Sequence, residues 1–330
     1  MNHILTLLSL GIALTFMAQK KKTDIAKTQL MEHLSVLAHD SMEGRETGTI
    51  GLEKAARYLI THYKKIGLKP FAANGSYRQW YKLPYVEDGM TTDKASNIIG
   101  MIEGESKPEE FVVISAHYDH IGKTATDVYN GADDDGSGTA ALLAIANHLM
   151  EEKKQGRGLS RSIVFIAFSG EEKGLWGSEF FSDHPTFSLK KTTADINIDM
   201  IGRIDTERNK ADTMNYVYVV GHNKLSSDLH PLLDETNAFG HQLVLDYKFD
   251  SPFDLERIYY RSDHYNFARK GVPVLFFYDG MLLGDYHQLT DEIEKITWGL
   301  YKKRVDFITD LLKNFANRTN MLKRDIPLND

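Results

Sequence analysis

The chain has 330 residues, a length that suits one large α/β domain or two modest ones. Its 42% hydrophobic and 26% charged residues are ordinary for a globular protein, and its formal net charge of -7 offers no basic surface for nucleic acid. It contains no cysteine, so disulfides and cysteine-ligated zinc are excluded. Any metal would therefore have to be bound by histidine, aspartate or glutamate.

Residues 4–18 form an almost unbroken apolar run, which is followed by Gln19 and three lysines. Such a run is too short to span a bilayer comfortably, but it has the length of a signal-peptide core. We therefore expect residues 1–18 to be a signal peptide and residues 19–330 to be a single domain without a membrane anchor after cleavage. This interpretation predicts a periplasmic or secreted protein. An uncleaved membrane anchor is the alternative.

The next part of the chain alternates helical and strand patterns. Residues 28–39 carry apolar side chains at helical spacing, and residues 52–66 form an amphipathic pattern that Gly67 should end. The segment 71–85 is aromatic and irregular. Short apolar strands are predicted at 97–102 and 111–116, and an Ala- and Leu-rich segment at 139–150 predicts a buried helix.

The second half continues this alternation with mostly apolar strands. Strands are predicted at 162–168, 196–200, 217–220, 243–245 and 272–277, and a long closing helix is predicted at 292–315. Continuously apolar strands are typical of a sheet that is covered on both faces. We therefore predict an α/β protein, a three-layer αβα sandwich whose central sheet is mixed but mostly parallel. No internal repeat or linker divides it.

Three consecutive carboxylates, Asp133, Asp134 and Asp135, lie among glycines between a predicted strand and a predicted helix. Crowded carboxylates repel one another and are costly to bury unless a cation lies among them. Two simpler interpretations remain open at this point. The loop could be a solvated acidic loop, or Asp135 or Ser137 could cap the following helix.

Further ionisable side chains follow other predicted strands. His117 and Asp119 come after the strand at 111–116, Glu171 and Glu172 come after 162–168, and Asp199 ends the strand that begins at 196. Ligand sites in open α/β sheets gather at the carboxyl ends of the strands, so these side chains should converge on a metal site. Neutral imidazole with oxygen ligands suits zinc, and Asp119 should orient His117 by accepting a ring N–H. Of the two glutamates, one can ligate the metal while the other takes a proton from water.

A second histidine ligand has two candidates. One lies in Ser262-Asp263-His264, and the other is His287, which follows the strand at 272–277 and has Asp291 close enough to orient it. The residues alone leave both candidates open.

Five segments together resemble the co-catalytic di-zinc aminopeptidase family, which includes bacterial secreted leucyl aminopeptidases. The relatives of this family are glutamate carboxypeptidase II, the glutaminyl cyclases and the transferrin receptor ectodomain. The resemblance covers about residues 30–312, and Glu43-Gly44-Arg45 with Gly48-Thr49 and Gly51 matches the secreted bacterial branch. The five segments are His117-Tyr118-Asp119, Gly131-Ala132-Asp133-Asp134-Asp135-Gly136-Ser137-Gly138, Glu171-Glu172-Lys173-Gly174, Asp199-Met200 and Tyr286-His287.

The resemblance implies two Zn²⁺ ions per chain and assigns a role to each matching residue. The ligands of one zinc would be His117 and Asp199, those of the other would be Glu172 and His287, and Asp134 would bridge both and be followed by a cis peptide bond. Glu171 would be the general base. Tyr286 matches a tyrosine that helps to stabilise the oxyanion, although some members use the segment that matches 258–260. His264 would then belong to the surrounding wall, and Asp119 and Asp291 would support the ligands.

The expected activity is that of an exopeptidase, most simply an aminopeptidase whose substrates are peptides with a free N-terminus. A carboxypeptidase or dipeptidase is an alternative, and it would need cationic side chains such as Arg203 and Arg261 to bind a carboxylate. A glutaminyl cyclase uses one zinc and lacks the first histidine, so His117 argues against it. An inactive receptor-like ectodomain would lack ligands, whereas all five are present here.

Overall fold

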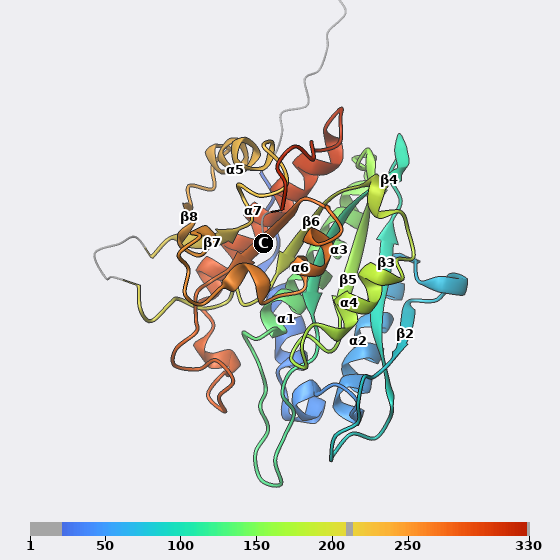
Figure 1. Cartoon of the computed structure of the whole chain (residues 1–330), viewed down its shortest axis with the longest axis vertical. Coiled ribbons are helices and arrows are strands. Elements are labelled where there is room, and N and C mark those ends of the chain that lie inside the picture. Colours follow the sequence, from blue (N-terminus) through green and yellow to red (C-terminus); the bar gives the residue numbers. More distant parts are fainter. Residues whose placement is uncertain (1–21, 209–213, 329–330) are drawn as a thin grey trace, which may run out of the picture.

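The computed structural model describes residues 22–208 and 214–328. A mixed sheet lies between two layers of helices, as the sequence predicts (Figure 1). The helices are α1 (Lys27–Leu37), α2 (Ile50–Ile66), α3 (Gly136–Lys154), α4 (Trp176–Asp183), α5 (Leu229–Ala238), α6 (His264–Ala268) and α7 (Trp298–Asn317). The strands are β1 (Lys69–Pro70), β2 (Arg78–Lys82), β3 (Lys94–Ile102), β4 (Lys107–His117), β5 (Arg161–Phe168), β6 (Thr192–Ile198), β7 (Tyr216–Val220), β8 (Val244–Asp246) and β9 (Val274–Tyr278).

The strands are ordered β1-β3-β5-β4-β6-β9-β7-β8, and β2 pairs with β3 beside this path. The central strands β5, β4, β6 and β9 run parallel to one another, whereas β3 and β7 join this group antiparallel. Residues along β4 alternate between the two faces. Val112 and Ile114 pack with α1, α2, α3 and α7, while Val113 packs on the opposite face with residues of α4 and α6. Both faces are therefore covered, which explains why β5 and β6 are buried along their whole length and why most of the central strand residues are apolar.

Most predicted elements are confirmed within four residues at their ends, and two predictions need correction. The closing helix was predicted over 292–315, but residues 293–295 form a separate 3-10 turn and α7 begins at Trp298. The backbone at Ile296 is extended, so the apolar spacing there does not reflect a helix. The irregular segment 71–85 contains β2, in which Gln79 and Tyr81 are buried while the alternate residues are exposed or half-buried.

Four parallel strands deliver their carboxyl ends to one edge of the sheet. They end at His117, Phe168, Ile198 and Tyr278. The predicted site residues follow directly after three of these ends, and this edge therefore carries the candidate site. The predicted signal peptide lies outside the described residues. Among the described residues, no helix has both the length and the apolar character needed to cross a bilayer.

Candidate metal centre

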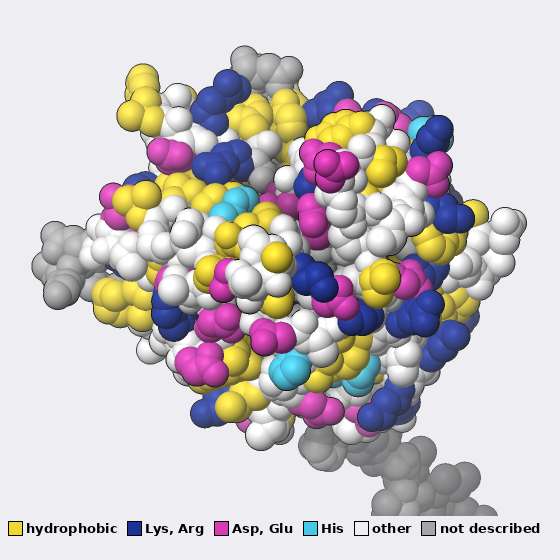
Figure 2. All heavy atoms as spheres, turned by 90° about the horizontal axis from the view of Figure 1, so that it is seen from below, with side chains coloured by type: hydrophobic (Ala, Val, Ile, Leu, Met, Phe, Trp, Pro, Cys, Tyr) yellow, Lys and Arg dark blue, Asp and Glu magenta, His cyan; other side chains and the backbone are white. Residues whose placement is uncertain are grey.

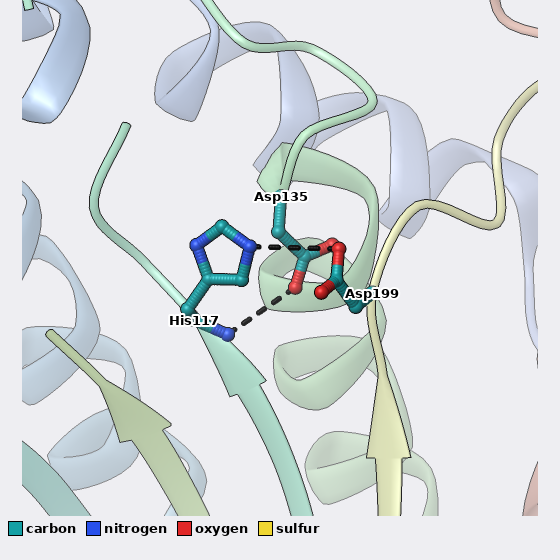
Figure 3. A group of neighbouring side chains, drawn as sticks. All are labelled: His117, Asp135 and Asp199. Atoms are coloured by element: carbon teal, nitrogen blue, oxygen red, sulfur yellow. Dashed lines mark hydrogen bonds and ion pairs between the residues drawn. The ribbon is translucent and has the colours of Figure 1, made fainter. Parts of the chain in front are cut away.

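His117, the last residue of β4, points at the carboxylates that arrive from the neighbouring strand end and loop. Its Nε2 atom lies 3.3 Å from Oδ1 of Asp134, 3.5 Å from Oδ1 of Asp199 and 4.0 Å from Oε2 of Glu171. Figure 3 shows the imidazole ring directed at Asp199, which follows β6. The histidine and these three carboxylates form one half of the centre.

His287 and Glu172 form the other half. Nε2 of His287 lies 2.8 Å from Oε2 of Glu172 and 3.2 Å from Oδ2 of Asp134. The two oxygens of Asp134 therefore face different histidines, one from each half. The structure brings together the five residues that were predicted as metal ligands, and His287, rather than His264, is the second histidine at this place.

Asp135 lies near the same ligands but has a different role. Its carboxylate accepts hydrogen bonds from three backbone N–H groups, those of His117, Gly138 and Met200. These bonds cap α3 and join the ends of β4 and β6 to it (Figure 3). The simple N-cap interpretation is therefore correct for Asp135, whereas both side-chain oxygens of Asp134 face the histidines of the centre. The peptide bond between Asp134 and Asp135 is cis, as the resemblance implies.

Two predicted supporting residues make other contacts than expected. His117 Nδ1 donates to the backbone oxygen of Asp119 at 3.2 Å, and the Asp119 carboxylate lies farther away, at 3.7 Å. That carboxylate instead accepts from the backbone N–H of Glu171 at 3.3 Å and from Thr47 Oγ1 at 3.0 Å. The prediction that Asp291 orients His287 is not supported, because its carboxylate accepts the N–H groups of Asp133 and Asp134. Asp291 thus holds the carboxylate loop.

Arg45 also stabilises the carboxylate loop, a role that was not predicted. Its guanidinium is buried and donates to the carbonyl oxygens of Leu37, Tyr118, Asn130 and Gly131 at 2.6 to 3.0 Å. Burial lowers the pKa of Arg45, although neighbouring carboxylates oppose this. The sequence signal was the Glu43-Gly44-Arg45 segment, which carries no information about what the arginine contacts.

Ser262 is a further supporting residue that sequence reasoning missed. Its hydroxyl donates to Oδ2 of Asp199 at 2.6 Å, and Nδ2 of Asn197 donates to the Ser262 oxygen at 2.8 Å. His264 is fully buried and stacks on Phe276, which lines the pocket beside the centre. Burial lowers the pKa of His264 to about 3. The segment 262–264 therefore supports a ligand and the pocket wall.

A cavity of about 30 Å³ opens beside the centre. Asp134, Glu171 and Asp199 line it together with Arg261 and Tyr286. Its apolar wall consists of Met200, Ile258, Phe276, Tyr278 and Leu282. A larger cavity of about 550 Å³ shares Arg261, Leu282 and Tyr286 with it. On the face seen in Figure 2, recessed acidic side chains are visible between raised parts of the surface.

Tyr286 and Glu171 both face this pocket. The ring of Tyr286 stacks on the His287 ring with their centroids 3.9 Å apart. Burial and the nearby carboxylate of Asp134 raise the pKa of Tyr286. Burial also raises the pKa of the Glu171 carboxyl, and the negative charge of Asp199 adds to this effect while His117 opposes it.

His120 is a third histidine at the centre, and no role was predicted for it. Its ring is buried, and Nδ1 lies 2.9 Å from Oε1 of Glu172. The available signal was its position in His117-Tyr118-Asp119-His120, directly after a buried strand.

The residues present fit a pair of divalent ions. Two ligand atoms that each lie about 2.1 Å from a tetrahedral ion are about 3.4 Å apart. The contacts of Asp134 with His117 and His287, at 3.3 and 3.2 Å, match this spacing. Nε2 of His287 and Oδ2 of Asp134 are also buried atoms without a hydrogen-bond partner among the described residues. Imidazole and carboxylate ligands are those that zinc accepts in proteins.

Comparisons with known proteins identify the family of this chain. Residues 97–312 match the sequence profile of Peptidase family M28. Aminopeptidase YwaD of Bacillus subtilis is 35% identical over 166 residues, which cover 49% of this chain and 30% of that protein. A leucine aminopeptidase precursor from Bacteroides thetaiotaomicron superposes with a TM-score of 0.68 at 17% identity, covering 89% of this chain and 99% of that one. A glutaminyl cyclase of Fimbriiglobus ruber superposes equally well, with a TM-score of 0.68, 17% identity and coverage of 89% and 97%.

The curated relatives are longer proteins, and the matches span between 30% and 53% of their lengths. At this level of identity, the two solved structures show a shared fold. The profile match covers more than half of the chain and includes all five predicted ligands. The chain belongs to Peptidase family M28.

Proposed function

We propose that this protein is a metal-dependent aminopeptidase that binds two zinc ions and uses Glu171 as its general base. The observation that carries the proposal is the position of Asp134, whose two oxygens face His117 and His287 at 3.3 and 3.2 Å. Four carboxylates, those of Asp134, Glu171, Glu172 and Asp199, lie largely buried within this group. Two divalent cations would carry a positive charge equal to the negative charge of the four carboxylates. This compensation lowers the free-energy cost of burying the carboxylates.

The chemistry follows from where these side chains lie. Two bound zinc ions would acidify a water molecule and polarise the carbonyl group of the scissile peptide bond. Glu171 lies at the pocket, 4.0 Å from His117 Nε2, and accepts the proton of the attacking water. It then returns this proton to the leaving amine nitrogen, so no covalent intermediate with the protein is required. Tyr286 lies at the same pocket, and its hydroxyl donates a hydrogen bond to the developing oxyanion.

The alternative tyrosine is placed less well for this role. Tyr259 is buried and contacts Tyr260, His264 and Tyr265 through its ring. Neither Tyr259 nor Tyr260 is among the residues that line the small pocket, whereas Tyr286 is. This favours Tyr286 as the hydroxyl donor.

Recognition of a free N-terminus fits the charge of the site. A substrate amine would meet the carboxylates around Asp134, and the apolar pocket wall would take an uncharged side chain. A carboxypeptidase needs a cation for the substrate carboxylate, and Arg203 is already engaged by Asp285 at 2.5 Å. The position of Arg261 favours the carboxypeptidase alternative. It lines both cavities, and its contact with Glu256 is 3.4 Å long.

A substrate panel tests the proposal. Purified metal-loaded protein is assayed with aminoacyl amides, with N-acetylated peptides and with peptides amidated at the C-terminus. An aminopeptidase cleaves amidated substrates and ignores acetylated ones. A preference for free C-termini that disappears in the Arg261→Met variant would instead establish the carboxypeptidase. Conversion of N-terminal glutamine to pyroglutamate on the intact peptide, with release of ammonia, would establish the cyclase.

Export is a separate part of the proposal. We infer from the apolar run at residues 4–18 that the leader is removed and that the mature chain is periplasmic or secreted. N-terminal sequencing of the native protein should find a start near Gln19. Intact chain in the cytoplasm would contradict this.

A further inference from the structure

His120 is buried beside Glu172 in the second half of the metal centre. Its Nδ1 atom lies 2.9 Å from Oε1 of Glu172, while the other oxygen of Glu172, Oε2, lies 2.8 Å from Nε2 of His287. The carboxylate of Glu172 therefore lies between two imidazole rings and presents a different oxygen to each. The two rings meet edge to face, with their centroids 5.8 Å apart.

The position of the His120 ring is fixed by backbone that surrounds it. The N–H of His120 donates to the carbonyl of Arg45 at 3.3 Å, and residue 120 pairs with Glu46 in an isolated β-bridge. Gly131 packs against the ring, and a Cβ atom at Gly131 would lie only 2.5 Å from Cγ of His120. Since φ at Gly131 is +53°, other residues are disfavoured there for a second reason. The ring is therefore held in place by the protein itself.

The contacts of His120 separate it from the proposed ligands. Its Nδ1 lies 3.8 Å from Oδ2 of Asp134, whereas Nε2 of His287 lies 3.2 Å from the same oxygen. Only Glu172 is within hydrogen-bonding distance of His120 Nδ1, among the contacts of the described residues. The Nδ1 atom of His120 forms a hydrogen bond with Oε1 of Glu172, whereas Nε2 of His287 has no hydrogen-bond partner among the described residues. An ionised carboxylate can only accept, so Nδ1 of His120 is the donor in this hydrogen bond. A protonated Nδ1 has no lone pair with which to bind a metal.

We propose that His120 is a positioning residue that orients Glu172 for the second metal ion. By donating its Nδ1–H to Oε1, His120 directs Oε2 toward the place where Asp134 and His287 converge. The inference rests on the proposed metal centre and adds to it a residue outside the five ligands. Loss of such an outer contact typically lowers metal affinity by about ten- to a hundredfold.

Two substitutions distinguish this role from packing and from direct ligation. His120→Phe fills a similar volume but removes the donor. His120→Asn is smaller, yet its side-chain amide places an N–H close to the position of Nδ1 and restores the donation. His230→Phe is a matched control, because this histidine is half-exposed on α5 and contacts Asp234 instead.

The test is a zinc titration of the metal-free full chain in competition with a chromophoric chelator. We expect His120→Phe to weaken one of the two binding steps by about ten- to a hundredfold and to leave the other unchanged. His120→Asn should return that step close to the value of the unchanged chain. Thermal unfolding of the metal-free variants checks that each one folds, and His120→Leu replaces the Phe variant if the larger ring is not accommodated.

Unchanged affinities in His120→Phe would overturn the inference. Equal losses in the Phe and Asn variants would overturn it as well, because they would assign His120 to direct ligation or to packing alone. If the unchanged chain binds a single ion, the proposed pair of ions fails. The affinities of His120→Phe and His120→Asn for that single ion then still decide whether His120 orients Glu172.

Discussion

The two halves of the metal centre are built on different parts of the fold. His117 and Asp199 come directly from the ends of β4 and β6, and their side chains are 1% and 11% exposed. His287 comes from the long connection between β9 and α7, and its side chain is 33% exposed. Its backbone also adopts a positive φ of 56°, which is unfavourable for a residue with a side chain.

Because of this difference, the half that contains Glu172 and His287 depends more on supporting contacts than the half that contains His117 and Asp199. Adjacent parallel strands fix His117 and Asp199 through their backbone hydrogen bonds. Glu172 and His287 lie on loops and need side chains such as His120 to fix them. We therefore expect the first half to bind its ion more tightly, and the following variants break or sharpen this comparison.

The largest effect should come from Arg45, because it supports the loop that both halves share. Arg45→Met leaves the buried carbonyl oxygens of Leu37, Tyr118 and Asn130 without their donor, and each such group costs about 1–3 kcal/mol. We expect the free energy of unfolding to fall by at least about 3 kcal/mol, measured by chemical denaturation of the metal-free chain. Arg57→Met, at an exposed arginine on α2, should change it little. Equal stabilities for the two variants would refute the role of Arg45.

The second effect concerns only the half that contains His287. His287→Ala removes a ligand, so the affinity for one ion should fall by more than the roughly hundredfold loss typical of an outer contact. Activity should be lost with it. His264→Ala should leave both zinc affinities near normal, since His264 packs on Phe276 and does not reach the centre. Should the two variants behave the other way round in a zinc titration, the assignment of the second histidine is wrong.

A smaller effect should lie outside both halves, where His33 of α1 contacts Tyr58 and His62 of α2. Burial lowers the pKa of His33 from 6.5 to about 4, and the positive charges of His62 and Lys65 add to this. Because the folded state binds the proton less well than the unfolded state, stability contributed by neutral His33 is lost as the pH falls from 6.5 to 4. The loss should be about 1–3 kcal/mol over this range.

His33→Gln should flatten the dependence of unfolding free energy on pH in that window. His230→Gln, at an exposed histidine, should leave it unchanged. A slope that stays the same in His33→Gln would show that another group titrates there.

The smallest effect should fall on the first half alone. Ser262→Ala removes the hydroxyl that donates to Asp199, yet Asp199 keeps its place after β6. We expect one zinc affinity to fall by about tenfold, the lower end for an outer contact. In competition titrations, Ser262→Ala should weaken one of the two zinc-binding steps, and His120→Phe should weaken the other. Loss of the same step in both variants would show that the two halves are not separately supported.

The sequence predicts the first half of the centre better than the second. His117 ends β4, Glu171 and Glu172 follow β5, and Asp199 follows β6. These strands are largely apolar and parallel, and parallel strands must bring their ends to one edge. The choice of His287 over His264 came from resemblance, because loop conformation decides which histidine reaches the centre. The loop after β9 also placed Asp291 against Asp133 and Asp134 rather than beside His287.

The roles of His120, Arg45 and Ser262 could not be predicted for a related reason. Each acts through a contact with a residue distant in the sequence, such as Glu172 for His120 and Asn130 for Arg45. Nothing in the local pattern specifies these partners. Similarly, apolar spacing at 293 and 296 suggested a helix, although the backbone there is a 3-10 turn followed by an extended residue.

The division of labour between Glu171 and Glu172 tests the central claim most directly. Zinc content and kcat are measured for Glu171→Gln and Glu172→Gln across a zinc titration. We expect Glu171→Gln to keep two ions per chain while kcat falls by about a hundredfold to ten-thousandfold, because the amide cannot accept a proton. Glu172→Gln should bind zinc more weakly and regain part of its activity in excess zinc. Loss of metal from the Glu171 variant, or full zinc occupancy without turnover in the Glu172 variant, would contradict the proposed mechanism.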